Sequence, residues 1–333
     1  MLRYVGRRIL IMIPTVIVIS MVVFFIIQLP PGDFMSSYIA SMEASNEVFD
    51  MNTIARMRES YGLDKPWYVQ YLKWMYGILT RGDFGYSFSY NKPVMDILGQ
   101  RMATTLSISL ITMAFTYFVS IPAGIYSAVK QYSFGDYLIT FLGFLGMATP
   151  NFLFAIILMV VSFYWFGNPM LGLMSNQFVS APMTWAKLLD IMKHMVIPVI
   201  VIGTANTCGL IRVMRGQLLD ELNRPYVLTA RAKGLSEKRI LYKYCVRASL
   251  NPIASSIGWS LTAIFTGSTI SAIVMNLPTQ GPVLYKALLN QDMYLAGSWL
   301  FLMAIMTVVG TLLSDILLAW LDPRVRMAGR EVK

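Results

Sequence analysis

Residues 229–252, TARAKGLSEKRILYKYCVRASLNP, form a basic segment between two long apolar runs, at residues 191–211 and 253–275. Each run has the length of about 20 residues that a helix needs to cross a membrane. Alternation of such runs with basic connecting segments is typical of proteins that cross a membrane several times. This pattern predicts a membrane protein with several helical spans, and the basic segment is a candidate functional site.

The composition of the whole chain also indicates a membrane protein. Hydrophobic residues make up 56% of the chain and charged residues 13%, and the mean hydropathy is +0.58, far from the balance of a soluble domain. We expect an all-α integral membrane protein with six transmembrane helices, near residues 9–29, 103–128, 138–165, 191–211, 253–275 and 297–320. The first run is too long for a signal peptide and no small-residue cleavage site follows it, so it predicts a retained signal anchor.

The Lys and Arg residues indicate the orientation of the chain, because cytoplasmic connections retain positive charge more readily than translocated ones. They gather near the N-terminus, in residues 212–247 and at the C-terminus, so both termini are expected in the cytoplasm. The chain then divides into a cytoplasmic N-terminus with the first helix, an extracytoplasmic segment, a five-helix core and a cytoplasmic tail, at residues 1–29, 30–101, 102–321 and 322–333. The net charge of +10 lies in segments beside the membrane, which face anionic lipid or an intracellular partner and not nucleic acid.

The extracytoplasmic segment is rich enough in order signals to fold. Between Asp64 and Thr80, Pro66 suits a first helical turn, and apolar residues follow at near-helical spacing. We expect an amphipathic helix that lies on the outer membrane surface, caps the helix bundle or contacts a soluble partner. In RGDFGYSF, residues 81–88, Gly82 and Gly85 stand where a tight aromatic loop needs them.

The sequence predicts no catalytic residue and no metal or cofactor site on this chain. His194 has no Cys, His or carboxylate neighbour at metal-ligand spacing, and no Gly is followed by Lys, which excludes a standard phosphate-binding loop. Cys208 and Cys245 are expected to be packing residues, not a disulfide. Asp315 lies in the last span, close enough to its inner end to find water, Ser314 or a basic partner, so we expect it to be structural. Buried acidic groups are few for an ion-coupled carrier, and the energy source is expected on another protein.

The basic segment is predicted to form two short helices joined at a glycine. Asn223 and Pro225 can open the first helix and Gly234 can close it in a left-handed cap, after which Ser236 starts the second. Asn251 and Pro252 are expected to stop the second helix. The small residues Ala230, Ala232 and Gly234, beside the cations Arg231 and Lys233, would let another protein approach closely. By charge alone, a juxtamembrane loop bound to lipid headgroups is an equal alternative.

Several motifs resemble those of the permeases of ATP-binding-cassette (ABC) importers, specifically the peptide and nickel permease family. They are YVGRRIL before the first span, PGD at residues 31–33, YGLDKPWYVQYLKW from residue 61, RGDFGYSF, ATPNF from residue 148, the basic segment, and LDPRVR from residue 321. They cover nearly the whole chain and follow the order of the family. The general signature of such permeases begins with Glu-Ala-Ala, whereas this chain has Thr229, Ala230 and Arg231, which looks like the variant found in peptide permeases.

The resemblance implies a six-helix permease that forms one half of a pair. Its partners would be a second homologous permease subunit, two cytoplasmic ABC ATPase subunits that hold ATP and Mg²⁺, and an extracytoplasmic solute-binding protein, in the cytoplasmic membrane of a bacterium or archaeon. The coupling loop would span residues 212–251, and its contact with an ATPase would come from Thr229, Ala230, Arg231, Ala232, Lys233 and Gly234. ATP hydrolysis would take place on the separate subunits, so this chain would not be an enzyme.

The translocation path and the cargo are less defined. Asn151, Asn206 and Thr266 are polar candidates for the path, although helix packing uses such residues too. The family implies dipeptides or oligopeptides as cargo, with oligosaccharides and nickel as alternatives. A self-sufficient carrier or channel is the competing class, and it would lack associated ATPases.

Overall fold

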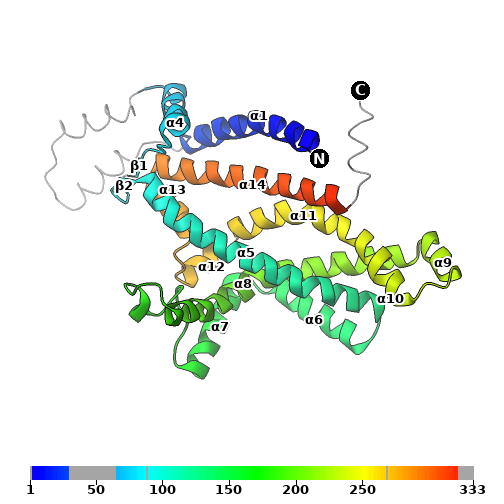
Figure 1. Cartoon of the computed structure of the whole chain (residues 1–333). Helices are drawn as coiled ribbons and strands as arrows, with labels where there is room; N and C mark the ends of the chain where they lie inside the picture. Colours follow the sequence, from blue (N-terminus) through cyan, green and yellow to red (C-terminus); the bar gives the residue numbers. More distant parts are fainter. Residues whose placement is uncertain (1, 30–64, 88, 268, 322–333) are drawn as a thin grey trace, which may run out of the picture. The chain divides into compact units, whose positions relative to one another are not determined.

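The computed structural model describes residues 2–29, 65–87, 89–267 and 269–321, and these residues are almost entirely helical (Figure 1). The helices that follow one another along the chain are α1 (Leu2–Ile27), α4 (Trp67–Arg81), α5 (Val94–Val129), α6 (Phe134–Ala148), α7 (Asn151–Phe166), η1 (Asn176–Phe178), α8 (Trp185–Leu222), α9 (Pro225–Ala232), α10 (Glu237–Arg239), η2 (Ile240–Cys245), α11 (Val246–Gly267), α12 (Thr269–Val274), α13 (Gln280–Leu289) and α14 (Met293–Leu321). Strands β1 (Tyr86–Ser87) and β2 (Lys92–Pro93) pair antiparallel, with Tyr86 opposite Pro93. The expected all-α class is confirmed.

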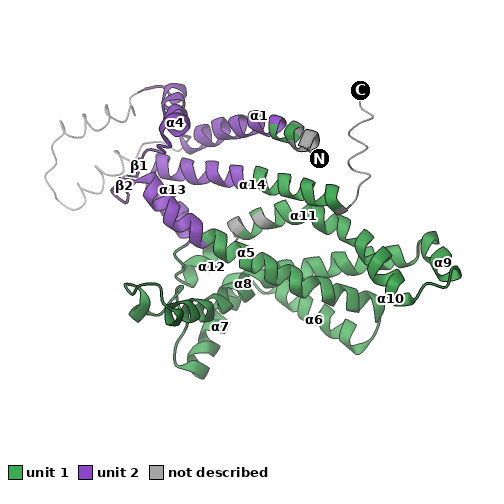
Figure 2. Cartoon of the chain, in the orientation of Figure 1, with its two compact units in different colours: residues 1–9, 105–278, 307–333 green, residues 10–104, 279–306 purple. Residues whose placement is uncertain are grey.

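The chain forms two compact units, which Figure 2 shows in green and purple. Unit 1 comprises residues 1–9, 105–278 and 307–333, and unit 2 comprises residues 10–104 and 279–306. Helices α1, α5 and α14 contribute residues to both units.

Four helices among the described residues are long and apolar enough to cross a membrane: Arg8–Ile27 of α1, α5, α8, and Met293–Trp320 of α14. The single third span expected at residues 138–165 is instead two helices, α6 and α7, bent by 106°. The bend lies at Pro150, which disfavours helical geometry at the residue before it, and Thr149 takes an extended conformation. The fifth expected span is divided between α11 and α12. The count of six transmembrane helices therefore stays a prediction.

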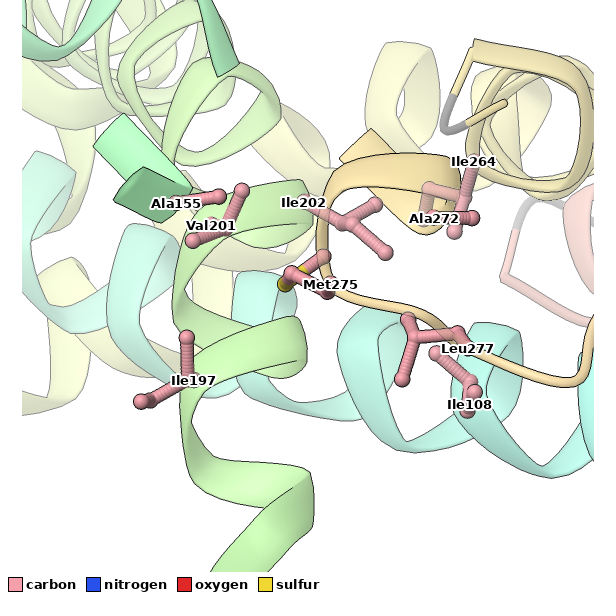
Figure 3. Close-up of a cluster of buried hydrophobic side chains, with 9 residues drawn as sticks. All are labelled: Ile108, Ala155, Ile197, Val201, Ile202, Ile264, Ala272, Met275 and Leu277. Carbon is pink, nitrogen blue, oxygen red and sulfur yellow. The ribbon is translucent and has the colours of Figure 1, made fainter. Parts of the chain in front are cut away.

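Helix α8 is central to unit 1. Its residues Val201 and Ile202 lie in a buried apolar cluster with Ala155 of α7 and Met275, which follows α12 (Figure 3). The remaining members are Ile108, Ile197, Ile264, Ala272 and Leu277. Burial of these side chains, at roughly 25 cal/mol per Å² of apolar surface, holds α8 against its neighbours.

A second feature of unit 1 is the close crossing of α11 and α14. A Cβ atom added at Gly258 would collide with the backbone of Gly310, so the two helices approach at a distance that glycine alone permits. The Gly258 amide donates a hydrogen bond of 2.6 Å to Ser314 Oγ across this crossing.

Unit 2 holds the described part of the segment that follows α1. The amphipathic helix expected between Asp64 and Thr80 is confirmed as α4, and Gly82 and Gly85 take positive φ angles of 64° and 92°, as the predicted loop requires. Buried Asp292, just before α14, accepts hydrogen bonds from Ser87 Oγ at 2.6 Å and from the Ser89 amide at 3.1 Å. The carboxylate thereby ties the hairpin loop to the start of α14. Residues 30–64 and 322–333, parts of the predicted extracytoplasmic segment and tail, lie outside the described residues.

Candidate functional site

The candidate site is the basic segment between α8 and α11, whose first element is the short helix α9. Helix α8 continues past the predicted end of its span to Leu222, and Asn223 Nδ2 donates a hydrogen bond of 3.0 Å to the Leu219 carbonyl. Asn223 thus closes α8, and the expectation that it opens the next helix is wrong. Arg224 is the N-cap of α9, and Pro225 occupies the first helical turn, where its missing N–H costs nothing.

Helix α9 ends at the predicted glycine. The Gly234 amide donates a hydrogen bond of 2.9 Å to the Arg231 carbonyl, and the Leu235 amide donates one of 3.2 Å to the Ala230 carbonyl. These two bonds, with φ of +75° at Gly234, make a Schellman cap. The left-handed cap that the sequence predicts is therefore confirmed, and it turns the chain sharply toward α10.

One side of α9 packs into the chain's own core. Val227 has no exposure and Ala230 is 8% exposed, and both lie in a buried cluster with Met214 and Leu218 of α8. The other buried members are Ala128, Ile240, Cys245, Val246 and Ile253. Ala230 therefore packs inside unit 1, and of the predicted small residues Ala232 and Gly234 are the exposed ones.

The opposite side of α9 is open. Thr229, Arg231, Ala232, Lys233 and Gly234 are all exposed, as is the apolar side chain of Leu228, at 65%. Sequence reasoning missed Leu228. The signal for it was present, because two adjacent apolar residues, Val227 and Leu228, on so short a helix cannot both face one core.

The second helix of the segment is longer than expected. Helix α10 continues through the π-helical turn η2 into α11, which reaches Gly267. The expectation that Asn251 and Pro252 stop this helix is therefore wrong. Proline inside a helix costs about 3 kcal/mol. Ile240 and Cys245, both without exposure, and Ile253 beyond the proline pack in the same cluster as α9, and this burial offsets the cost.

One ion pair and one hydrogen bond lie on the exposed side of the segment. The guanidinium of Arg231 donates two hydrogen bonds to the Glu237 carboxylate, at 2.7 and 3.1 Å, and this contact lowers the pKa of Glu237. The Tyr226 hydroxyl donates to Glu221 Oε2 at 2.6 Å, and partial burial together with this bond raises the pKa of Tyr226. Since Arg231 and Glu237 flank Gly234, their pairing holds the turn between α9 and α10.

The predicted path residues lie on three different helices of unit 1. Asn151 is the first residue of α7, directly after the bend, and Asn206 lies within α8; both are half-buried. Thr266 belongs to α11, and its side chain lies outside the described part. No hydrogen bond between Asn151 and Asn206 occurs among the described residues, so their role in a path stays a prediction.

Two titratable residues that the sequence singled out have partners in unit 1. His194 is buried, with Nδ1 at 2.9 Å from the Asp190 carbonyl oxygen and 3.6 Å from the Asp190 carboxylate. The expectation that His194 has no carboxylate neighbour is therefore wrong. Asp315 forms an ion pair of 3.2 Å with Arg8 of α1. It therefore has a basic partner, as expected for a structural role.

Family comparisons agree with the motifs. Residues 120–327 match the family described as binding-protein-dependent transport system inner membrane component, and residues 1–109 match its N-terminal counterpart. The oligopeptide transport system permease protein AppB of Bacillus subtilis is 34% identical, covering 98% of this chain and 99% of that protein. The peptidoglycan transport system permease protein YejB of Agrobacterium fabrum is 31% identical, covering 99% of both.

A dipeptide permease and a transporter of known structure are also similar to this chain. The dipeptide transport system permease protein DppB of Escherichia coli is 30% identical, covering 98% of this chain and 99% of that protein. Among solved structures, an inward-facing form of the MetNI methionine ABC transporter matches with a TM-score of 0.49 and 13% identity, covering 68% of this chain and 97% of that chain. From the family match and the full-length relatives, the chain belongs to the binding-protein-dependent transport system inner membrane components, the permease subunits of ABC importers.

Proposed function

We propose that this chain forms half of the translocation path of an ATP-driven importer for peptides, which a solute-binding protein delivers. The other half would come from a second homologous permease. Two cytoplasmic ABC ATPase subunits would bind ATP and Mg²⁺ and carry out hydrolysis, so this chain would supply no catalytic residue.

The observation that carries the proposal is α9. Its buried side, Val227 and Ala230, fixes the helix to α8 and α11, while Leu228 and Arg231 lie exposed on the other side. A helix held rigidly at one side and open at the other can transmit a displacement. We assign the open side to a cleft of the ATPase, with Thr229, Ala232, Lys233 and Gly234 as further contacts.

The orientation follows from the basic residues. Most Lys and Arg of the chain lie in the N-terminal residues, residues 212–247 and the C-terminal residues, and such residues stay on the cytoplasmic side. This orientation brings α9 to the side of the membrane where ATP is available. Both termini would lie on that side as well.

The mechanism is a two-state switch. ATP binds the closed ATPase dimer more tightly than the open one, and it shifts the permease only through this difference in affinity. Closure would move α9, and the buried cluster that joins α9 to α8 and α11 would pass the movement to the membrane helices.

Peptides are the cargo that the relatives favour, because AppB is named for oligopeptides and DppB for dipeptides. The similarity to YejB, named for peptidoglycan, makes fragments that join peptide and sugar a second candidate. Uptake assays with matched libraries of di- to hexapeptides and of muropeptides would separate the two.

Co-purification tests the partners. The tagged chain, solubilised from its native membrane, is expected to bring down a second permease and one or two kinds of ATPase subunit, identified by mass spectrometry. A chain that purifies alone, after extraction in several mild detergents, would favour a self-sufficient carrier or channel.

A further inference from the structure

Helix α4 in unit 2 exposes an apolar side that no described residue covers. Tyr68, Leu72, Tyr76 and Leu79 follow one another at spacings of four, four and three residues, which brings them to one side of a helix. Leu72, Tyr76 and Leu79 are 62, 64 and 77% exposed. Apolar side chains of this size in one stripe mark a surface that meets lipid or another protein.

The buried side of α4 is separate from this stripe. Tyr71 and Trp74, each 4% exposed, pack against Phe24 of α1 and Phe301 of α14. The ring of Trp74 lies 5.3 Å from Phe24 and 5.7 Å from Phe301, measured between centroids. These contacts fix the rotation of α4 about its axis, so the apolar stripe is not free to turn inward.

The stripe continues an apolar surface that belongs to α1. The most apolar 18-residue stretch of Arg8–Ile27 has a mean hydropathy of 3.0, and only 11% of that stretch is buried. Its exposed side chains include Ile17, Val18, Met21, Val22, Phe25 and Ile26. At the end of this span the Phe25 ring meets Trp67 of α4 edge to face at 5.5 Å, and Gln28 Nε2 donates a hydrogen bond of 3.0 Å to Gln70 Oε1. Figure 2 shows α4 running across the end of α1, not along it.

We propose that α4 is an interfacial helix that lies in the membrane surface at the end of α1, with its apolar stripe among the lipids. The inference rests on α1 crossing the membrane, as the family and the proposed function require. Trp67, Tyr68 and Tyr76 are the aromatic residues that the headgroup region favours. Lys73, Thr80 and Arg81 are exposed; Lys73 and Thr80 border the stripe and Arg81 lies opposite it. Basic residues on the polar side of an amphipathic helix are typical of interfacial binding.

Lipid fits this stripe better than a soluble protein does. Trp67 links the stripe to the exposed surface of α1, because its ring meets Phe25 of α1 at 5.5 Å and Tyr68 of the stripe at 6.0 Å, between centroids. A bilayer that surrounds α1 therefore reaches α4 without a gap. Its role would be to hold the loop after Arg81, with the hairpin that Asp292 clamps, at a fixed height above the bilayer.

Site-directed spin labelling tests the proposal on the full chain, purified with its partners and reconstituted in nanodiscs. Cys208 and Cys245 are first replaced by Ala, and single cysteines are then labelled at Leu72, Tyr76 and Leu79 on the stripe. Matched controls are Lys73 and Arg81 on the polar side of the same helix, and Ile17 on the lipid-facing side of α1. Each label reports the ratio of its accessibility to oxygen, which enters lipid, and to a water-soluble nickel chelate.

The ratio at the three stripe positions is expected to be several-fold higher than at Lys73 and Arg81, and close to that at Ile17. Equal water accessibility at all five α4 positions, with Ile17 in lipid, would overturn this inference and leave the proposed function intact. Stripe labels that lose nickel access only after a solute-binding protein is added would overturn it in favour of a docking surface. Water accessibility at Ile17 itself would contradict the membrane span on which the proposed function depends.

Discussion

Asp292 is a buried carboxylate that accepts several hydrogen bonds. Besides Ser87 Oγ and the Ser89 amide on one oxygen, the Leu295 amide donates to Oδ1 at 3.3 Å, which caps the start of α14. Replacing one oxygen by an amide NH₂ would set a donor against a donor. A buried group left unsatisfied in this way costs about 1–3 kcal/mol.

Asp292→Asn is therefore expected to lower the thermal stability of the purified protein and to speed amide hydrogen exchange in residues 86–93. Asp83→Asn is the matched control, because Asp83 is exposed and accepts a single 2.8 Å bond from the Gly85 amide. Equal effects of the two substitutions would contradict the clamp that we assign to Asp292.

Gly234 has a left-handed backbone conformation and open space around it. Nothing lies within 4 Å of a Cβ atom added there, yet its φ of +75° is unfavourable for most side chains, by about 1–2 kcal/mol. Bulk at Gly234 therefore has space within the chain, and a large side chain would collide only with a partner.

Gly234→Trp is expected to insert into the membrane normally but to lose transport while the ATPases continue to hydrolyse ATP. Gly234→Asn is the control for backbone strain, because Asn tolerates the left-handed conformation, and it should keep most of the uptake. Full uptake by Gly234→Trp would contradict a close approach at this residue.

Single residues also show what the sequence can specify. Gly234 could be assigned from its local context, since a glycine after a short helix predicts a left-handed cap. The roles of Ala230 and Asp292 could not be assigned in this way, because each depends on contacts with a distant part of the chain. Ala230 packs against α8, and Asp292 binds the hairpin loop.

At the scale of elements, α9 has two apolar residues with opposite roles. Val227 is fully buried and Leu228 is 65% exposed. Substituting each by Ala therefore tests the folding of α9 and its binding to the ATPase separately. Val227→Ala should destabilise the attachment of α9 by about 2 kcal/mol, seen as faster hydrogen exchange in residues 225–235.

Leu228→Ala should leave this exchange unchanged and weaken binding of the ATPase about tenfold, which corresponds to about 1.4 kcal/mol. The affinity can be measured with purified ATPase and the permease in nanodiscs. Unchanged affinity in Leu228→Ala would remove the open side of α9 from the coupling site.

The elements themselves were predictable where the signal was local. The amphipathic spacing of α4 and the apolar runs of α1, α8 and α14 gave helices at the expected places. Pro150 and Pro252 show the limit. The first bends the chain between α6 and α7 and the second lies inside α11, because tertiary packing, which a local pattern does not contain, decides what each proline does.

At the scale of the whole molecule, four described helices are long and apolar enough to cross a membrane, and the basic segment belongs to unit 1. The family is shown by matches along nearly the full length. Cargo and direction of transport are properties of an assembly, and the composition of one chain predicts them only through resemblance.

The most direct test is reconstitution of the chain with its second permease and ATPases in liposomes. ATP is enclosed in the lumen, and a solute-binding protein loaded with labelled peptide is added outside. The account predicts peptide accumulation that needs both ATP and the binding protein and that disappears in Gly234→Trp. Accumulation without ATPases, driven by an ion gradient, would contradict it.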